Sequence, residues 1–346
     1  MALALTPFEV RRAARRCTCA ADSAAAMAHS RLVVLLFPSN GGASDPLCIA
    51  QALVGFLSPS ELADAFDRVP ELATAVGPEA ASAVAAARDD APGSAAAVTA
   101  LRTAFAALMS LDAAAAAAAV SLAVARLRNG KSSAAAAAGS AAPAADARDA
   151  LLLRLHAQYG GDVGVLAASM LNHVTLAPGE AVALAANEPH AYLAGECVEI
   201  MATSDNVVRA GLTPKLRDVA TLLSMLAYTQ GAPRILHGSA ADHADADAAC
   251  VRAYAPGFEE FALAAAEVPA GRAAPLRPSA GAAVLLVVAG TGEAVQQHDG
   301  GDDVAVPLAP GAAWLLPPGA RVTLRAGKDA QLRAFRARVA EATAGA

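Results

Sequence analysis

The chain has 346 residues, enough for roughly two or three domains. Alanine inflates the hydrophobic fraction of 56%, whereas aromatic residues make up only 4%, so large core side chains are scarce. The net charge of −6 argues against a nucleic-acid or membrane-surface partner, and no apolar run approaches the roughly 20 residues of a membrane span. Five cysteines without a C-x-x-C pair predict neither a disulfide framework nor a zinc knuckle, so we expect a reducing, cytoplasmic location.

The first part of the chain changes character twice. "MALAL" at the start has the pattern of a short strand, and residues 10–51 that follow have loop composition and no sustained period. From Leu53 the spacing of apolar residues becomes helical. Ser58, Pro59 and Glu61 have the arrangement of a capping box with proline at the first helical position, which predicts a helix start.

Three further segments are predicted as helices. They lie around Glu79–Arg88, Ala95–Arg128 and Ala150–Gln158. The low-complexity run "KSSAAAAAGSAAPAADA" between the last two is expected to be an exposed linker.

After "YGGDVG" the period changes from helical to alternating. "VTLAPGEAVALAANEPHAYL" predicts strand, Pro-Gly turn, strand, turn and strand. The rest of the chain consists mostly of short β-runs broken by proline and glycine, except for a helical pattern at Leu216–Leu226.

One internal repeat stands out in this β-rich part. Leu176–Asn187 ("LAPGEAVALAAN") aligns without gaps to Leu308–Gly319 ("LAPGAAWLLPPG") at an offset of 132. Two small β-barrels of one type in tandem would produce such a repeat, although turn-strand units of this kind are also common in unrelated β proteins. At the same offset, Val322 stands where the first copy has His190, so we expect the second barrel to be structural.

The polar residues between Asn187 and Lys215 form the densest polar stretch in the chain. His190 and Tyr192 share one face of the predicted strand, because side chains alternate with period two. The others follow closely: Glu196, Glu199, Asp205, Arg209 and Lys215. For any one of them a structural histidine or a solvated loop is the simpler explanation. Together they favour a metal or polar-ligand site, because a polar barrel interior is costly without a ligand.

The histidines limit what this stretch can be on its own. His190 is a candidate metal ligand, but the other histidines show no H-x-H or H-x-x-x-H spacing. A catalytic zinc needs about three protein ligands. The chain therefore supplies a partial metal site.

The segment "NEPHAYLAGECVEIMATSDNVVRAGLTPKLRDVATLLSML" resembles the signature region of type I phosphomannose isomerases (mannose-6-phosphate isomerases), members of the cupin superfamily. "MALALTPFE", "ALVGFLSPSELADAF", "LHAQYGGDVGVLAASMLNHVTLAPGEA" and "YAPGFEEFALAAAEVP" are similar to other segments of that family. The resemblance covers most of the chain apart from residues 10–51.

The resemblance implies a mainly β fold with an inserted α domain and two cupin-type (jelly-roll) β-barrels, the first incomplete. The implied division gives a strand of the catalytic domain at 1–9 and an atypical insert at 10–51. A helical domain at 52–158, the remainder of the catalytic domain at 159–230 and a C-terminal cupin-like domain at 231–346 would follow.

The reaction that the resemblance implies is the zinc-dependent interconversion of mannose 6-phosphate and fructose 6-phosphate, which feeds GDP-mannose synthesis and glycosylation. It implies His190 as a zinc ligand and Arg209 as a catalytic cation. Tyr192 and Lys215 match substrate-pocket residues. The isomerisation passes through an enediol(ate) and needs a base, for which Glu199 and Asp205 both remain candidates. We expect a sugar-phosphate substrate, a monomeric chain, and no nucleic-acid or membrane partner.

The family's other zinc ligands lie in Q-x-H-P and K-P-E-M motifs that this sequence lacks. We expect the chain to begin just past the third of these ligands, which would leave it inactive or weak. Deleting residues 10–51 restores the family pattern, so this block is either a retained intron or a lineage-specific loop, and its cysteines carry no functional assignment. The alternative to an isomerase is a non-catalytic cupin-type protein that binds sugar phosphates.

Overall fold

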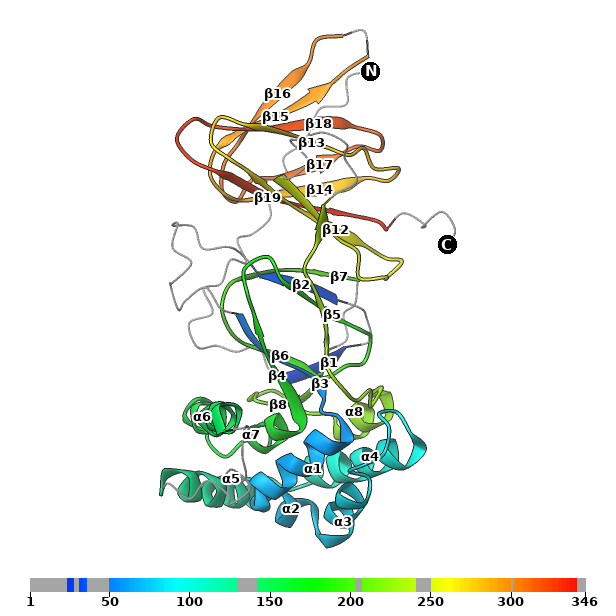
Figure 1. Cartoon of the computed structure of the whole chain (residues 1–346), viewed down its shortest axis with the longest axis vertical. Helices are drawn as coiled ribbons and strands as arrows, with labels where there is room; N and C mark the ends of the chain where they lie inside the picture. Colours follow the sequence, from blue (N-terminus) through cyan, green and yellow to red (C-terminus); the bar gives the residue numbers. More distant parts are fainter. Residues whose placement is uncertain are drawn as a thin grey trace.

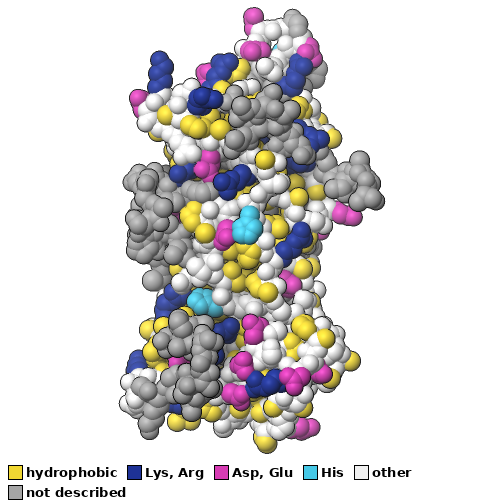
Figure 2. Space-filling model, in the orientation of Figure 1, with side chains coloured by type: hydrophobic (Ala, Val, Ile, Leu, Met, Phe, Trp, Pro, Cys, Tyr) yellow, Lys and Arg dark blue, Asp and Glu magenta, His cyan; other side chains and the backbone are white. Residues whose placement is uncertain are grey.

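The computed structural model describes residues 24–27, 31–35, 50–129, 142–202, 207–240, 250–299 and 301–340. Figure 1 shows three layers along the long axis of the molecule: a helical unit, a first β-sandwich and a second β-sandwich. On the face shown in Figure 2, basic and acidic side chains are interspersed over all three layers. The predicted strand at Met1–Leu5 lies outside the described residues.

The helical unit is built from short helices that pack around one apolar core. They are α1 (Pro59–Arg68), α2 (Pro70–Val76), α3 (Pro78–Ala86), α4 (Ala95–Met109), α5 (Ala113–Arg128), α6 (Ala142–Tyr159), α7 (Gly164–Ala167) and the 3₁₀ turn η3 (Ala168–Met170). The predicted capping box at α1 is confirmed. The Glu61 N–H donates to Ser58 Oγ, and the Ser58 N–H donates to Glu61 Oε2.

Three helix boundaries differ from the expectations. The helical pattern that was expected from Leu53 begins at Pro59, because Ala50–Phe56 forms strand β3. The single segment Ala95–Arg128 is two helices bent by 106°, and Asp112 caps the second by accepting from the Ala115 N–H at 2.7 Å. Part of the expected linker opens α6, because alanine favours helix and proline is tolerated in a first turn.

The helices were also compared with the length and hydropathy of a membrane span. Among the described residues no single helix is both long enough and apolar enough to span a membrane. Helices α4 and α5 meet both conditions only when they are taken together as one bent pair.

The second sandwich contains two antiparallel sheets. Its strands are β10 (Ser239–Ala240), β11 (Val251–Tyr254), β12 (Ala262–Val268), β13 (Ala273–Leu276), β14 (Ala283–Ala289), β15 (Gly292–Gln297), β16 (Val304–Leu308), β17 (Ala313–Leu316), β18 (Arg321–Ala326) and β19 (Leu332–Arg338). The sheet orders are β10-β11-β12-β19-β14-β17 and β13-β18-β15-β16. If β12 to β19 are counted from one to eight, these orders read 1-8-3-6 and 2-7-4-5. Both sheets contribute to one apolar cluster, so they pack face to face.

The first sandwich repeats this order with strands from distant parts of the chain. They are β1 (Ala24–Met27), β2 (Arg31–Leu35), β3 (Ala50–Phe56), β4 (Leu171–Leu176), β5 (Ala181–Leu184), β6 (His190–Ala194), β7 (Cys197–Met201), β8 (Val207–Gly211) and β9 (Arg234–Leu236). The orders are β4-β3-β6-β1-β8 and β7-β2-β5-β9. Strands β1 and β2 fall inside residues 10–51. Strand β1 pairs with β6 and β8, and strand β2 pairs with β5 and β7.

The predicted repeat is confirmed in the element boundaries. In both copies the strand that ends at the repeat's first leucine, Leu176 of β4 or Leu308 of β16, leads through a Pro-Gly turn into a four-residue strand. With the same offset, β4 to β7 correspond to β16 to β19. The two sandwiches are therefore built on one strand order, and the helical unit lies between β3 and β4 of the first.

Each sheet of the first sandwich has an outer partner. Leu53, Ala191 and Leu193 of the five-stranded sheet belong to the core of the helical unit. Ala181 and Ala183 of β5 pack against the second sandwich. Tyr254 Oη donates to the Gly179 carbonyl at 2.6 Å, which fixes the second sandwich to the turn before β5. The predicted helix at Leu216–Leu226 is α8 (Val219–Met225).

Candidate active site

The interior of the first sandwich lies between its two sheets. Val54, Val174, Val182 and Leu184 form its apolar floor, and Tyr192 packs against them. Because alternate residues of a strand point to opposite faces, the neighbours Ala191 and Leu193 face the helical unit, while His190 and Tyr192 face the interior. The predicted shared face of His190 and Tyr192 is therefore confirmed.

His190 is held in a defined orientation at the start of β6. Its side chain is buried, with 5% exposed, and its Nδ1–H donates to the Glu188 carbonyl at 2.9 Å. A histidine fixed in this way through Nδ1 has its lone pair on Nε2, which is the arrangement that metal-ligating histidines use. Burial raises the pKa of the Glu188 carboxyl, which accepts from the Ala185 N–H and closes the turn before β6.

Tyr192 joins the two sheets through a side-chain hydrogen bond. Its Oη donates to Glu199 Oε1 at 2.7 Å, and its ring centroid lies 5.9 Å from that of His190. Glu199 points inward from β7, because its neighbours Val198 and Ile200 pack against the second sandwich. One carboxylate oxygen of this candidate base is thus held next to the histidine–tyrosine pair.

Arg209 enters the interior from β8. Val208 and Ala210 belong to the core on the helical side, so Arg209 points the other way. Ala25 of β1 is in register with both His190 and Arg209, which places these two on one row of the sheet, about 10 Å apart across two strand spacings. Among the described residues the Arg209 guanidinium forms no hydrogen bond or ion pair, so it is available to an anionic ligand.

The remaining predicted residues lie at the rim or outside the described part. Lys215 is exposed in the segment after β8, where its N–H donates to Thr213 Oγ1 at 3.2 Å. Glu196 is exposed at the turn between β6 and β7. Asp205 lies outside the described residues, so the choice between Asp205 and Glu199 as base stays a prediction.

Asp162 is a positioning residue that the sequence reasoning missed. Its Oδ1 accepts from the N–H groups of Gly164 and Leu212, at 2.6 and 2.7 Å. The backbones of Gly164 and Gly211 approach so closely that a Cβ on Gly211 would lie 2.6 Å from Gly164 Cα. This contact fixes the end of β8 between Arg209 and Lys215. The glycines of "YGGDVG" were the available signal.

Asn172 is a second residue that was missed. It is 8% exposed on β4, and its Nδ2 donates to the carbonyls of Val54, Phe56 and Gly231 at 3.0, 3.0 and 2.9 Å. It holds the bulge of β3 at Gly55, whose N–H donates to the Pro189 carbonyl beside His190. A polar residue at an inward position of a predicted strand was the available signal.

The metal site is incomplete within the described residues. No group of three or more His, Cys, Asp or Glu side chains in that part of the chain could hold a metal ion. His190 has the burial and Nδ1 bond of a zinc ligand, but a zinc site needs about three protein ligands. The described residues therefore do not make a zinc site by themselves.

Comparison with known proteins shows one consistent class, the phosphomannose isomerases. The chain is 36% identical over 282 residues to mannose-6-phosphate isomerase 1 of Arabidopsis thaliana, covering 82% of this chain and 60% of that protein. It is 35% identical over 293 residues to mannose-6-phosphate isomerase of Rattus norvegicus, covering 83% of this chain and 65% of that protein. No family model matches the chain.

The similar solved structures agree in fold. The K86A mutant of phosphomannose isomerase from Salmonella typhimurium superposes with a TM-score of 0.62 at 23% identity, covering 90% of this chain and 66% of that one. A mannose 6-phosphate isomerase bound with zinc and yttrium gives a TM-score of 0.61 at 23% identity, covering 90% and 67%. The chain is thus a homologue of the mannose-6-phosphate isomerases, and it spans 60 to 65% of the length of the Arabidopsis and rat relatives.

Proposed function

We propose that the chain carries part of a mannose-6-phosphate isomerase site and acts on sugar phosphates, interconverting mannose 6-phosphate and fructose 6-phosphate. The observation that carries the proposal is the convergence of His190, Tyr192, Glu199 and Arg209 on the interior face of the first sandwich. Polar side chains at such a place are costly without a ligand, and sequence relatives named mannose-6-phosphate isomerase indicate which ligand to expect.

The strand order supports the same class of fold. We propose that both sandwiches are cupin-type jelly rolls, since the second reads 1-8-3-6 and 2-7-4-5. In the first, strands at positions two to eight have counterparts among the described residues, and position one would lie beside β7.

The residues can be given chemical roles in an aldose–ketose isomerisation. A base moves a proton between C1 and C2 of the substrate, and negative charge develops on the enediolate oxygen. Glu199 or Asp205 would carry the proton. The Arg209 guanidinium would stabilise the developing charge. Tyr192 and Lys215 would contact the sugar and its phosphate. Zinc is the proposed cofactor, with His190 as a ligand from this chain.

A second function is favoured by one observation, the incomplete metal site among the described residues. A cupin-type protein that binds sugar phosphates without turning them over needs Arg209, Tyr192 and Lys215 but no complete zinc site. The two functions differ in zinc content and turnover, while both require the interior polar residues.

The test combines three measurements on the purified chain: zinc per chain, binding of mannose 6-phosphate by calorimetry, and isomerase turnover. We expect binding of mannose 6-phosphate that Arg209→Ala weakens by about tenfold or more, because one charged contact contributes about 1.5 to 3 kcal/mol. Arg128→Gln, at the exposed end of α5, is the matched control and should leave binding unchanged. Turnover with bound zinc supports the isomerase, and binding alone supports the second function. Absence of sugar-phosphate binding would contradict both.

A further inference from the structure

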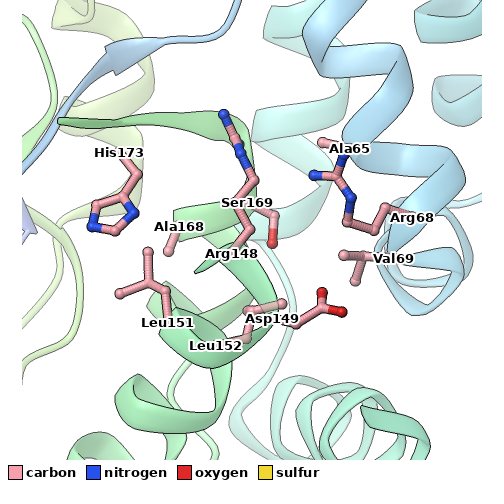
Figure 3. Close-up of a pocket in the computed structure, with 10 residues that line it drawn as sticks. All are labelled: Ala65, Arg68, Val69, Arg148, Asp149, Leu151, Leu152, Ala168, Ser169 and His173. Atoms are coloured by element: carbon pink, nitrogen blue, oxygen red, sulfur yellow. The ribbon is translucent and has the colours of Figure 1, made fainter. Parts of the chain in front are cut away.

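A second polar cluster lies on the other side of the five-stranded sheet from His190. There α1, α6, η3 and the start of β4 surround a small pocket that opens to solvent (Figure 3). We propose that this pocket binds a phosphate or phosphomonoester dianion. The site is separate from the proposed active site, because His173 of β4 points away from the interior that Val174 faces.

Two arginines give the pocket its charge. Arg68 comes from α1 and Arg148 from α6. In the view of Figure 3, Ser169 lies between the two arginine side chains. Among the described residues neither guanidinium forms a hydrogen bond or ion pair. Burial lowers the pKa of Arg148, and the like charge of Arg68 lowers it further. Two cations without a direct ion-pair partner among the described residues are thus held close together, as they are where an anion binds.

The buried donors around the pocket lack partners. Ser169 is 8% exposed, and its Oγ has no hydrogen-bond partner among the described residues. The same holds for His173 Nε2. Arg154 does not line the pocket, but its charge acts on His173; its Nε and Nη2 also lack a partner among the described residues, while its Nη1 donates to Gln51 Oε1 at 2.8 Å. An unsatisfied buried polar atom costs about 1 to 3 kcal/mol, so several in one place call for an unseen partner.

The donor set selects a phosphate. Guanidinium groups match the oxygens of phosphate in pairs, and a hydroxyl and an imidazole N–H can each donate one further bond. Burial lowers the pKa of His173, and the charges of Arg154 and Arg148 lower it further, so the imidazole is neutral and one ring nitrogen carries a proton. Asp149 also lines the pocket, and the charge of Glu61 acts on Arg148, so these carboxylates offset part of the positive charge of the two arginines.

A bound phosphate would connect the helical unit to the first sandwich. Arg68 and Arg148 belong to helices, whereas His173 belongs to β4 of the sheet that carries His190 on its other face. A ligand that contacts all three raises the stability of the native state by mass action. The pocket therefore gives the protein a phosphate-dependent stability that does not involve the proposed active site.

The experiment titrates the full chain with inorganic phosphate and, separately, with glycerol 3-phosphate, at constant ionic strength set with chloride. Binding is followed by calorimetry and by the rise in unfolding temperature. The double variant Arg68→Gln/Arg148→Gln should weaken binding by about a hundredfold, since each lost contact contributes about tenfold. Arg128→Gln is the matched control, and equal affinity for the two probes would identify the phosphate group alone as the ligand.

Two further variants keep the outcome decisive. Ser169→Ala removes an unsatisfied hydroxyl, so it should stabilise the phosphate-free protein while it weakens phosphate binding, a combination that a purely structural serine would not show. Arg209→Ala should leave this binding intact, which separates the pocket from the proposed active site. Unchanged phosphate affinity in the double variant, or its complete loss in Arg209→Ala, would overturn the proposal.

Discussion

The two sandwiches share a strand order but differ in what fills equivalent interior positions. In the first, His190 of β6 lies opposite Val54 of β3. At the equivalent place in the second, Val322 of β18 lies opposite Gln296 of β15. Both residues are buried: 5% of His190 and 2% of Val322 is exposed.

The difference distinguishes the sandwich that holds the proposed site from the one that does not. Val322 and Leu324 complete an apolar cluster in the second copy, whereas the first has His190 and Tyr192 at the same positions. An apolar interior stabilises a sandwich without further partners. A titratable interior needs fixed bonds such as His190 to Glu188 and Tyr192 to Glu199. The first interior thus holds polar side chains at positions where the second has apolar packing.

The largest expected change in the free energy of unfolding comes from exchanging the equivalent residues His190 and Val322 between the two sandwiches. Val322→His places an imidazole in an apolar cluster and should lower the free energy of unfolding by about 2 to 4 kcal/mol, from lost packing and an unsatisfied nitrogen. His190→Val should change it by less than about 1 kcal/mol, because the surrounding residues of the first interior are already apolar.

The chain offers a local probe for this exchange. Trp314, the single tryptophan, lies on β17 and packs against the second apolar cluster, so its fluorescence during urea unfolding follows the second sandwich. The β6 amides, followed by hydrogen exchange, report on the first. Equal destabilisation by the two substitutions would mean that the interiors do not differ in the way described.

Asn172 should give the next largest effect. Asn172→Ala removes the side-chain donor from the carbonyls of Val54, Phe56 and Gly231, of which Phe56 still accepts from the Gly231 N–H, and should destabilise the first sandwich by about 2 to 3 kcal/mol. The equivalent residue in the second copy is Val304, which is 47% exposed, so Val304→Ala should stay within about 0.5 kcal/mol. Hydrogen exchange at β3 and at β16 measures the two effects, and similar protection loss in both would refute the role of Asn172.

These cases show what the sequence could predict and why. Ser58 and Glu61 depend only on neighbouring residues, and the alternation of His190 and Tyr192 depends on one strand, so local patterns were sufficient. The Pro-Gly repeat predicted the tandem arrangement. By contrast, Asn172 acts on carbonyls more than 50 residues away in sequence, and Asp162 acts on a strand end in another element. Such contacts follow from the fold, and a single-sequence pattern does not encode them.

The bond between Tyr192 and Glu199 should have a smaller effect. Tyr192→Phe removes the hydroxyl and should lower the free energy of unfolding by about 0.5 to 1 kcal/mol, since Glu199 is exposed. A double-mutant cycle with Glu199→Gln measures the coupling between the two side chains. Leu324→Met, at the position equivalent to Tyr192, keeps an apolar contact and should show no coupling to Glu199→Gln. Additive effects of Tyr192→Phe and Glu199→Gln would contradict the proposed connection between the sheets.

The smallest expected effect is a pH dependence at His173, whose counterpart at the offset of 132 is Ala305. Burial and the charges of Arg154 and Arg148 on α6 lower the pKa of His173, while Arg68 on α1 and Asp149 line the same pocket. Well above about pH 6.5 the imidazole is neutral in the folded and unfolded states and contributes nothing. As the pH falls below that value, the unfolded state binds the proton first, so the free energy of unfolding decreases.

This decrease should amount to less than about 1 kcal/mol after solvent screening, and His173→Gln should remove it. Ala305→His, at an exposed position of β16, is the matched control, because a histidine there should titrate alike in both states and leave the profile parallel to that of the unsubstituted chain. The measurement is urea unfolding between about pH 5 and 8 in buffer without phosphate, since phosphate in the pocket would favour the protonated ring and reverse the slope. If His173→Gln leaves the pH profile unchanged, His173 contributes no more to the pH dependence of the free energy of unfolding than an exposed histidine at position 305, and the prediction is wrong.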